Sequence, residues 1–467
     1  MNRGADCVKH LVLSLRARTR CLTRHREHHN QAPLACAAHG AGQHRDSAYK
    51  TGDINMNESL INKKNERIFF FDNIRYLLVF LVVVFHMTCA YTNYANWWAV
   101  NDDNSVFFDY LMRLLNLFLM PVLFFISGYF ALPSLHRYGS YRFLKKKIIR
   151  LGIPWLVGVL LVGPIRIYIY QYSRGFEDIS MWQLFVLKTQ EAATFYTGFI
   201  TSSQQFHHSH FWFLSLLLFF FFVFVLLHKA ISFRAGRASP ENQITEPSIK
   251  SIILVFVLIS IVTAVITLIM FLLFIKEPGK QPFVIIASIL QFQPTRVGLY
   301  TTCFATGIYT FYKNWFYSIK TLGSPLGWLV LTLLLLLAEE NVFASLTSGL
   351  TPVLGVAYVT IKSFLVFSII MSLMTFGGKY WNSGSKLNQL LANNSYSIYL
   401  IHFVIVLSVQ LVMYKWWNVT IYAKFVTGSI LSLALSFLFS EFAVRRYPKS
   451  SILGVVSLFC VLVIVLN

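Results

Sequence analysis

The stretch FLSLLLFFFFVFVLL, residues 213–227, carries no charged side chain and no proline or glycine. Its apolar residues do not alternate with polar ones, so it lacks the pattern of a membrane-spanning β-strand. Further apolar runs recur along most of the chain, each near the length of about 18–20 residues that an α-helix needs to cross a bilayer. The sequence therefore predicts an all-α, polytopic transmembrane bundle.

The composition supports the same class of protein. Of the 467 residues, 56% are hydrophobic and only 13% are charged, whereas soluble globular chains carry roughly 25% charged residues. This balance excludes a soluble enzyme, a disulfide scaffold and a disordered chain. The six cysteines have no paired spacing, and because no metal or redox motif is visible, we expect no bound metal.

The apolar runs predict about ten spans and one shorter segment. A final stretch at 452–466 is short for a full crossing, and the sequence leaves open whether it spans, lies in the interface or packs on the bundle. The expected spans lie near 74–94, 107–131, 148–170, 211–229, 250–275, 283–312, 325–342, 352–376, 395–415 and 419–440.

The net charge of +21 lies mostly in short segments between the apolar runs, which indicates membrane topology rather than binding of nucleic acid. Every strongly basic segment lies before the first span or after an even-numbered span, so all of them are on one side of the membrane. The core is therefore predicted to have both ends in the cytoplasm. The loop at 171–210 is then extracytoplasmic, and its length makes it a candidate lid or binding loop. The basic segments are 63–67, 137–150, 229–250 and 445–449.

Three domains are expected: a leader at 1–66, a transmembrane domain at 67–449 and an apolar tail at 450–467. The leader contains none of the 43 phenylalanines, and we interpret it as a disordered segment, with Met56 as the working initiator. A transit peptide and a metal site are the alternatives; the spacing of the metal candidates fits no zinc pattern. Those candidates are Cys21, His25, His28, His29 and Cys36.

The first span contains three ionisable residues, Asp72, Arg75 and His86. Arg75 and His86 are separated by eleven positions, which returns to within about 20° of the same helix face and places them roughly 16 Å apart. Asp72, one turn before Arg75, can neutralise and orient it. Ionisable residues at membrane depth are costly and indicate function. Snorkelling of Arg75 and a structural hydrogen bond from His86 are the alternative.

Two further segments near the cytoplasmic side are informative. Lys147 and Arg150 stand at the start of the third span, where they form either an ordinary positive-inside cluster or an anion site for a phosphate-bearing ligand. Ser127 and Gly128 in the second span are small residues, which predicts close approach of another helix.

Four more residues are weaker candidates for substrate binding. His210 and Trp212 lie at the start of the fourth span, where an aromatic belt explains them equally well. His402 lies within the ninth span and Glu441 closes the tenth. A lone histidine inside a span is more often a satisfied residue of the bundle.

Taken together, these segments resemble the acyltransferase 3 family of bacterial integral-membrane acyltransferases, and they look most like its glucans biosynthesis protein C branch. The similarity covers roughly residues 67–449, and the motif at 72–86 is the most specific. The motifs run in family order: DNIRYLLVFLVVVFH (72–86), FFISGYF (124–130), RLGIPWL (150–156), HFWFL (210–214), SYSIYLIH (395–402) and EFAVRRYP (441–448).

The resemblance implies transfer of an acetyl or succinyl group from cytoplasmic acyl-coenzyme A to a hydroxyl of an extracytoplasmic glycan. It implies a protein of the bacterial inner membrane with acyl-coenzyme A as co-substrate and no permanently bound cofactor. By position, Arg75 and His86 match the family's essential pair. Lys147 and Arg150 match its basic pair, although lysine stands where arginine is common.

The expected mechanism places Lys147, Arg150 and Arg75 on the coenzyme A phosphates, with Asp72 positioning Arg75. His86 then acts as a general base on the acceptor hydroxyl, or carries the acyl group transiently. The sequence leaves these two routes open. The rival interpretation is a transporter or flippase for a glycan or an anionic small molecule, and a non-catalytic scaffold is a third. The glycan itself and the oligomeric state are not specified by the sequence.

Overall fold

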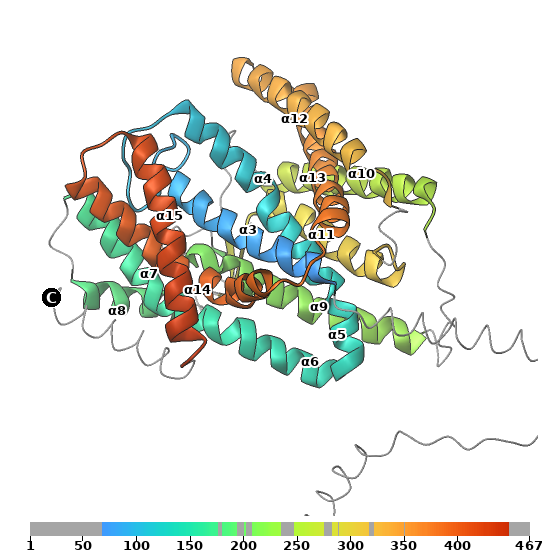
Figure 1. Ribbon diagram of the computed structural model, residues 1–467, viewed down its shortest axis with the longest axis horizontal. Helices are drawn as coiled ribbons and strands as arrows, with labels where there is room; N and C mark the ends of the chain where they lie inside the picture. Colours follow the sequence, from blue (N-terminus) through green and yellow to red (C-terminus); the bar gives the residue numbers. More distant parts are fainter. Residues whose placement is uncertain are drawn as a thin grey trace, which may run out of the picture. The chain divides into compact units, whose positions relative to one another are not determined.

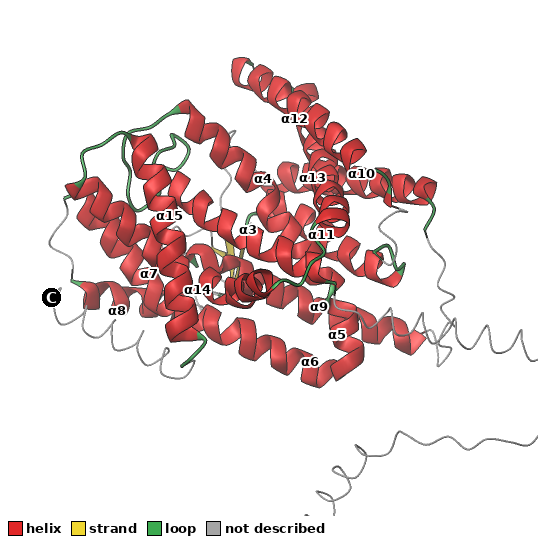
Figure 2. Ribbon diagram, in the orientation of Figure 1, coloured by secondary structure: helices red, strands yellow, loops and turns green. Residues whose placement is uncertain are grey.

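The structure, a computed structural model, describes residues 68–175, 180–193, 200–201, 208–234, 247–274, 283–287, 289–316, 322–349 and 351–447. The leader predicted at 1–66 and the tail predicted at 450–467 lie outside these ranges, as do Met56 and the metal candidates of the leader. The described chain is almost entirely helical, as Figure 2 shows.

Within the described residues, nine helices are long and apolar enough to cross a membrane, which confirms the predicted polytopic bundle. In Figure 1, α3 lies among its neighbours α4, α13, α14 and α15. Their cores are α3 (Phe69–Thr88), α4 (Val106–Tyr129), α7 (Ile153–Ser173), α9 (Trp212–Arg234), α10 (Ile249–Phe274), α12 (Pro325–Ser348), α13 (Pro352–Tyr380), α14 (Lys386–Trp416) and α15 (Ile421–Phe439).

Shorter elements connect and extend these helices. Three strands form one small antiparallel sheet in the order β1–β2–β3. These elements are α5 (Ala131–Tyr138), α6 (Ser140–Lys147), the π-helical turns η1 (Ile148–Gly152) and η5 (Ser440–Val444), α8 (Met181–Ala193), the 3₁₀ turn η3 (Ser209–Phe211), β1 (Ile200–Thr201), β2 (Val284–Ile286), β3 (Leu290–Phe292) and α11 (Pro294–Tyr312).

The span predicted at 283–312 is the clearest difference from expectation. Its first part pairs as the β2–β3 hairpin, and only α11 is helical. Pro294 occupies the first turn of α11, where its missing N–H and fixed φ favour a helix start. Continuous hydrophobicity alone does not distinguish a short buried hairpin from a helix.

Helix α11 packs against α4 and runs parallel to it. Arg296 near its start donates to Asn116 at 2.7 Å, while Gly307 lies against Phe125 further along both helices. Both ends of the core lie on one side of the bundle. Two contacts agree: the Phe70 N–H donates to Asn382 after α13, and Ser440 donates to Asn394 in α14.

The structure describes parts of the loop predicted at 171–210. Helix α7 continues to Ser173, and α8 packs against α7. The first span also differs, since α3 ends at Thr88 rather than near residue 94, and the chain then folds back through residues 89–105. Trp98 in this segment is only 2% exposed, and the Arg174 side chain donates to its carbonyl at 3.1 Å. This segment therefore covers the end of α3.

Candidate functional site

His86 lies in the last turn of α3 and points into the bundle, where it is 8% exposed. It is therefore held by protein rather than by lipid. Because α3 starts at Phe69 and ends at Thr88, His86 stands close to one end of its helix rather than at mid-span. Arg75, in the other half of the same helix, is 36% exposed and bonds Asp72 at 2.9 Å. The predicted pairing of Asp72 with Arg75 is thus present.

The His86 ring meets a second histidine across the bundle. His402 of α14 places its Nε2 atom 3.0 Å from Nδ1 of His86, and both side chains are buried. Nδ1 of His402 faces two backbone carbonyls of its own helix, those of Tyr399 at 2.8 Å and Ile398 at 3.2 Å. His402 is thus anchored on one nitrogen and bound to His86 by the other.

These partners assign the tautomer of each ring. Carbonyl oxygens only accept hydrogen bonds, so Nδ1 of His402 carries a proton and its Nε2, in the neutral ring, is an acceptor. The His86 Nδ1–H must then donate to that acceptor. This arrangement leaves the lone pair of His86 on Nε2. An imidazole held in this tautomer is suited to accept a proton.

Trp98 and Gln410 fix the position of His86 from another side. The indole of Trp98 stacks on the His86 ring with centroids 5.4 Å apart and donates to Gln410 Oε1 at 2.9 Å. Gln410 in turn donates to the carbonyls of His86 and Met87 at 3.0 and 3.1 Å. The ring and the end of its helix are therefore clamped together, which favours one orientation of the base.

His210, which the sequence predicts as a substrate-binding residue, joins this cluster. Its ring stacks on Phe403 at 4.6 Å and lies 5.1 Å from the ring of His402. The His210 side chain is buried. Trp212, two residues later, turns away and stacks on Tyr300. The structure thus brings together His86, His210 and His402, but not Trp212.

Glu441 is held away from the histidines. It accepts from Asn394 at 2.7 Å and pairs with Arg445 one turn later. Asn394 precedes His402 by about two turns of α14. Glu441 therefore links η5 to α14. This position gives no support to the role in substrate binding that was predicted for Glu441.

The three predicted anion-binding cations gather at the opposite end of α3. Arg75 and Arg150 both lie close enough to act electrostatically on Lys147. The Lys147 ammonium rests on the Phe221 ring at 4.1 Å, and the Arg150 guanidinium lies over the ring of Tyr396 at 5.0 Å. A cation–π contact with an aromatic ring positions a cation without neutralising its charge. The cluster can therefore bind a phosphate group.

Sequence reasoning missed Trp98 and Gln410, which contact His86, and it also missed His208 just before η3. Nδ1 of His208 accepts from the Trp155 indole of the RLGIPWL motif at 3.3 Å. The backbone N–H of His208 donates to the Gln291 side chain of β3 at 2.6 Å. Gln410 was detectable as a polar residue two turns after His402 in an apolar span. Trp98 and His208 lie in connecting segments, where a polar or aromatic residue does not stand out from its neighbours and so does not indicate a functional site.

The fold and site define the class: an integral-membrane protein whose bundle holds buried histidines at one end and a cation cluster at the other. The chain belongs to the acyltransferase 3 family, whose model, described as an acyltransferase domain, matches residues 68–441. This match confirms the resemblance seen in the sequence.

The chain is also similar to glucans biosynthesis protein C of Escherichia coli. The proteins from strain K12, from O1:K1 / APEC and from O139:H28 are each 32% identical over 111 residues, which is 24% of this chain and 28% of each relative. The aligned stretch thus spans less than a third of these relatives. No solved structure matches the chain.

Proposed function

We propose that this protein is an O-acyltransferase of the bacterial inner membrane. It transfers an acetyl or succinyl group from cytoplasmic acyl-coenzyme A to a hydroxyl of an extracytoplasmic glycan, either a periplasmic glucan or a surface polysaccharide. Family membership supports the acyl transfer, and the observation that carries the chemistry is the buried hydrogen bond between His86 Nδ1 and His402 Nε2, which assigns the lone pair of His86 to Nε2.

The donor end of the reaction uses the cation cluster. Lys147, Arg150 and Arg75 bind the coenzyme A phosphates, since charge-assisted hydrogen bonds to phosphate are strong and directional for guanidinium groups. Asp72 keeps the Arg75 side chain oriented along α3. The pantetheine arm then reaches between the helices toward His86, a rise of roughly 16 Å along the helix axis.

At the histidines, Nε2 of His86 takes the proton of the acceptor hydroxyl as its oxygen attacks the thioester carbonyl. The new C–O bond forms, the C–S bond breaks, and the departing thiolate takes the proton back from His86. The positive charge that develops on the ring is shared with His402 through the Nδ1–H bond. His210 lies beside this pair and supplies a contact to the acceptor.

Reconstitution of the purified protein with labelled acetyl- and succinyl-coenzyme A tests this function. We expect transfer to the glycan with one of the two donors, and loss of transfer by at least about 10²-fold in His86→Ala. His228→Ala is the matched control, because His228 is a partly exposed histidine of α9 remote from the cluster.

Full activity in His86→Ala would refute His86 as the base. Movement of glycan across the vesicle membrane without consumption of donor would instead favour the transporter interpretation.

A further inference from the structure

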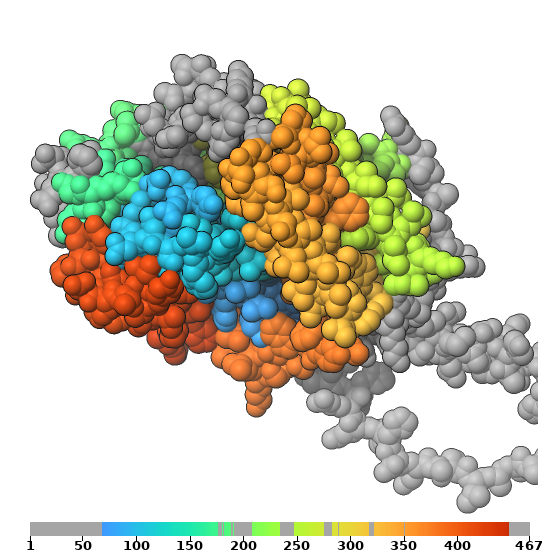
Figure 3. Space-filling view, turned by 90° about the horizontal axis from the view of Figure 1, so that it is seen from above, coloured from blue at the N-terminus to red at the C-terminus, as the bar shows by residue number. Residues whose placement is uncertain are grey.

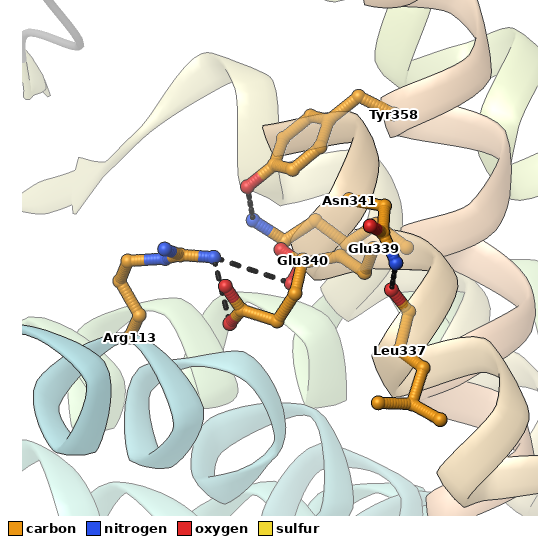
Figure 4. A network of polar contacts seen from close by, with 7 residues as sticks. Arg113, Leu337, Glu339, Glu340, Asn341 and Tyr358 are labelled. Carbon is orange, nitrogen blue, oxygen red and sulfur yellow. Dashed lines mark hydrogen bonds and ion pairs between the residues drawn. The ribbon is translucent and has the colours of Figure 1, made fainter. Parts of the chain in front are cut away.

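A second polar cluster lies inside the bundle among α4, α11, α12 and α13, apart from the histidines. Arg113 of α4 pairs with Glu339 and Glu340 of α12 at 3.3 and 3.0 Å and stacks on Phe343. Figure 4 shows this pairing, with Tyr358 of α13 beside the carboxylates. One cation thus engages both carboxylates of this cluster.

Within the described residues, two other cations of this region hydrogen-bond to neutral groups, and Glu339 acts on one of them, Lys362, at longer range. Arg296 donates to the side chain of Asn116 at 2.7 Å, and the Lys362 ammonium reaches the Tyr358 hydroxyl at 3.4 Å. Among the described residues, no carboxylate forms an ion pair with either one. A charge in an apolar interior is unfavourable unless an opposite charge compensates it.

Arg296 and Lys362 line the same cavity, about 110 Å³ in volume, between α4, α10, α11 and α13. Much of the remaining wall is apolar, with Leu117 and Leu299 among its residues. At its rim, Phe271 of α10 is 41% exposed, and the neighbouring Leu272 is 80% exposed. In a membrane this surface of α10 faces lipid, so the cavity lies beside acyl chains and has two cationic side chains in its wall.

We propose that this cavity binds the anionic headgroup of a membrane lipid, with Arg296 and Lys362 on its phosphate oxygens. A phosphate matches two cations that hydrogen-bond to neutral groups, and the apolar walls and the rim at Phe271 suit the attached acyl chains. A free phosphate shares the oxyanion chemistry but gains nothing from the apolar walls. The site is separate from the acyl-transfer residues, and its test does not depend on acyl transfer.

The experiment is thermal unfolding of the full-length protein in a neutral detergent, with added phosphatidylglycerol, phosphatidylcholine or inorganic phosphate. We expect phosphatidylglycerol alone to raise the melting midpoint. Lys362→Met should abolish that shift without lowering the midpoint in phosphatidylcholine, because it removes a buried charge that forms no ion pair with a carboxylate of the described residues. Lys379→Met, an exposed lysine on the same helix, is the matched control and should keep the shift.

Arg296→Gln provides a second variant should Lys362→Met fail to fold, and it should also lose the shift. An equal shift from inorganic phosphate, lost in these variants, would overturn lipid as the occupant. A phosphatidylglycerol shift that survives in both variants would overturn the site itself.

Discussion

The most informative residues are His86 and His402, because each is ambiguous alone. A single buried histidine is compatible with a structural hydrogen bond, whereas this pair has an ordered chain of donors and acceptors. That chain begins at the backbone carbonyls of α14 and ends at the lone pair on His86 Nε2. In the proposed mechanism His402 is therefore a positioning residue, which acts through His86.

Replacement of His402 by Leu should lower kcat by about 10²–10⁴-fold, the usual contribution of an oriented acid–base group. The KM for acyl-coenzyme A should stay unchanged, since the cation cluster is not altered. His402→Gln should restore part of kcat, because its amide oxygen can accept from the His86 Nδ1–H. Steady-state kinetics of both variants check this expectation. Equal losses in the two variants, or a raised KM, would indicate a structural role instead.

At the scale of elements, glycines set the contact between α4 and α11. A Cβ atom at Gly128 would lie 2.0 Å from the Phe304 carbonyl oxygen, and one at Gly307 would lie 2.1 Å from that of Phe125. The backbones thus meet directly, as small residues permit between membrane helices. This close approach confirms the packing role predicted for Gly128.

Gly128→Ala should accordingly lower the free energy of unfolding by about 1–3 kcal/mol or more, as overpacking of a close contact does. Gly355→Ala in α13 is the control, since its added Cβ meets nothing within 4 Å and the change should stabilise by roughly 0.5–1 kcal/mol. Thermal unfolding in detergent measures both. A Gly128→Ala protein as stable as the control would contradict the contact.

The element scale also shows where sequence patterns are ambiguous. The apolar run at 283–312 was expected to be one helix, yet it contains the β2–β3 hairpin before α11. Pairing with β1, which is distant in the sequence, completes that sheet. Local hydrophobicity reports burial, and it does not report whether the backbone hydrogen bonds are made within a segment or to another one.

At the scale of the whole molecule, contacts at both ends of the core establish that the termini of the transmembrane domain lie on one side. Which side faces the cytoplasm is predicted from the basic segments. The buried ion pair of Lys424 with Asp102, at 2.7 Å, belongs to the opposite end, where α15 meets the covering segment at 89–105. The orientation decides which substrate reaches which cluster.

Cysteine labelling measures this orientation directly. In a protein whose six native cysteines are replaced, Asp103→Cys should react with a membrane-impermeant maleimide on spheroplasts. Lys145→Cys should react only after permeabilisation, because the positive-inside rule places its segment in the cytoplasm. Both positions are exposed, so both should label in detergent. The reverse pattern on intact spheroplasts would invert the assignment of donor and acceptor sides.

The sequence by itself determined the class of protein, most of the helices and the alignment of Arg75 with His86 on one face. All three depend on hydrophobicity and spacing along a single segment. Only the tertiary structure decided that His86 meets His402, which is 316 positions away, and that Trp98 and Gln410 clamp it. It also separated Trp212 and Glu441 from the histidines, because the faces that meet depend on how whole helices pack, and no local period encodes that choice.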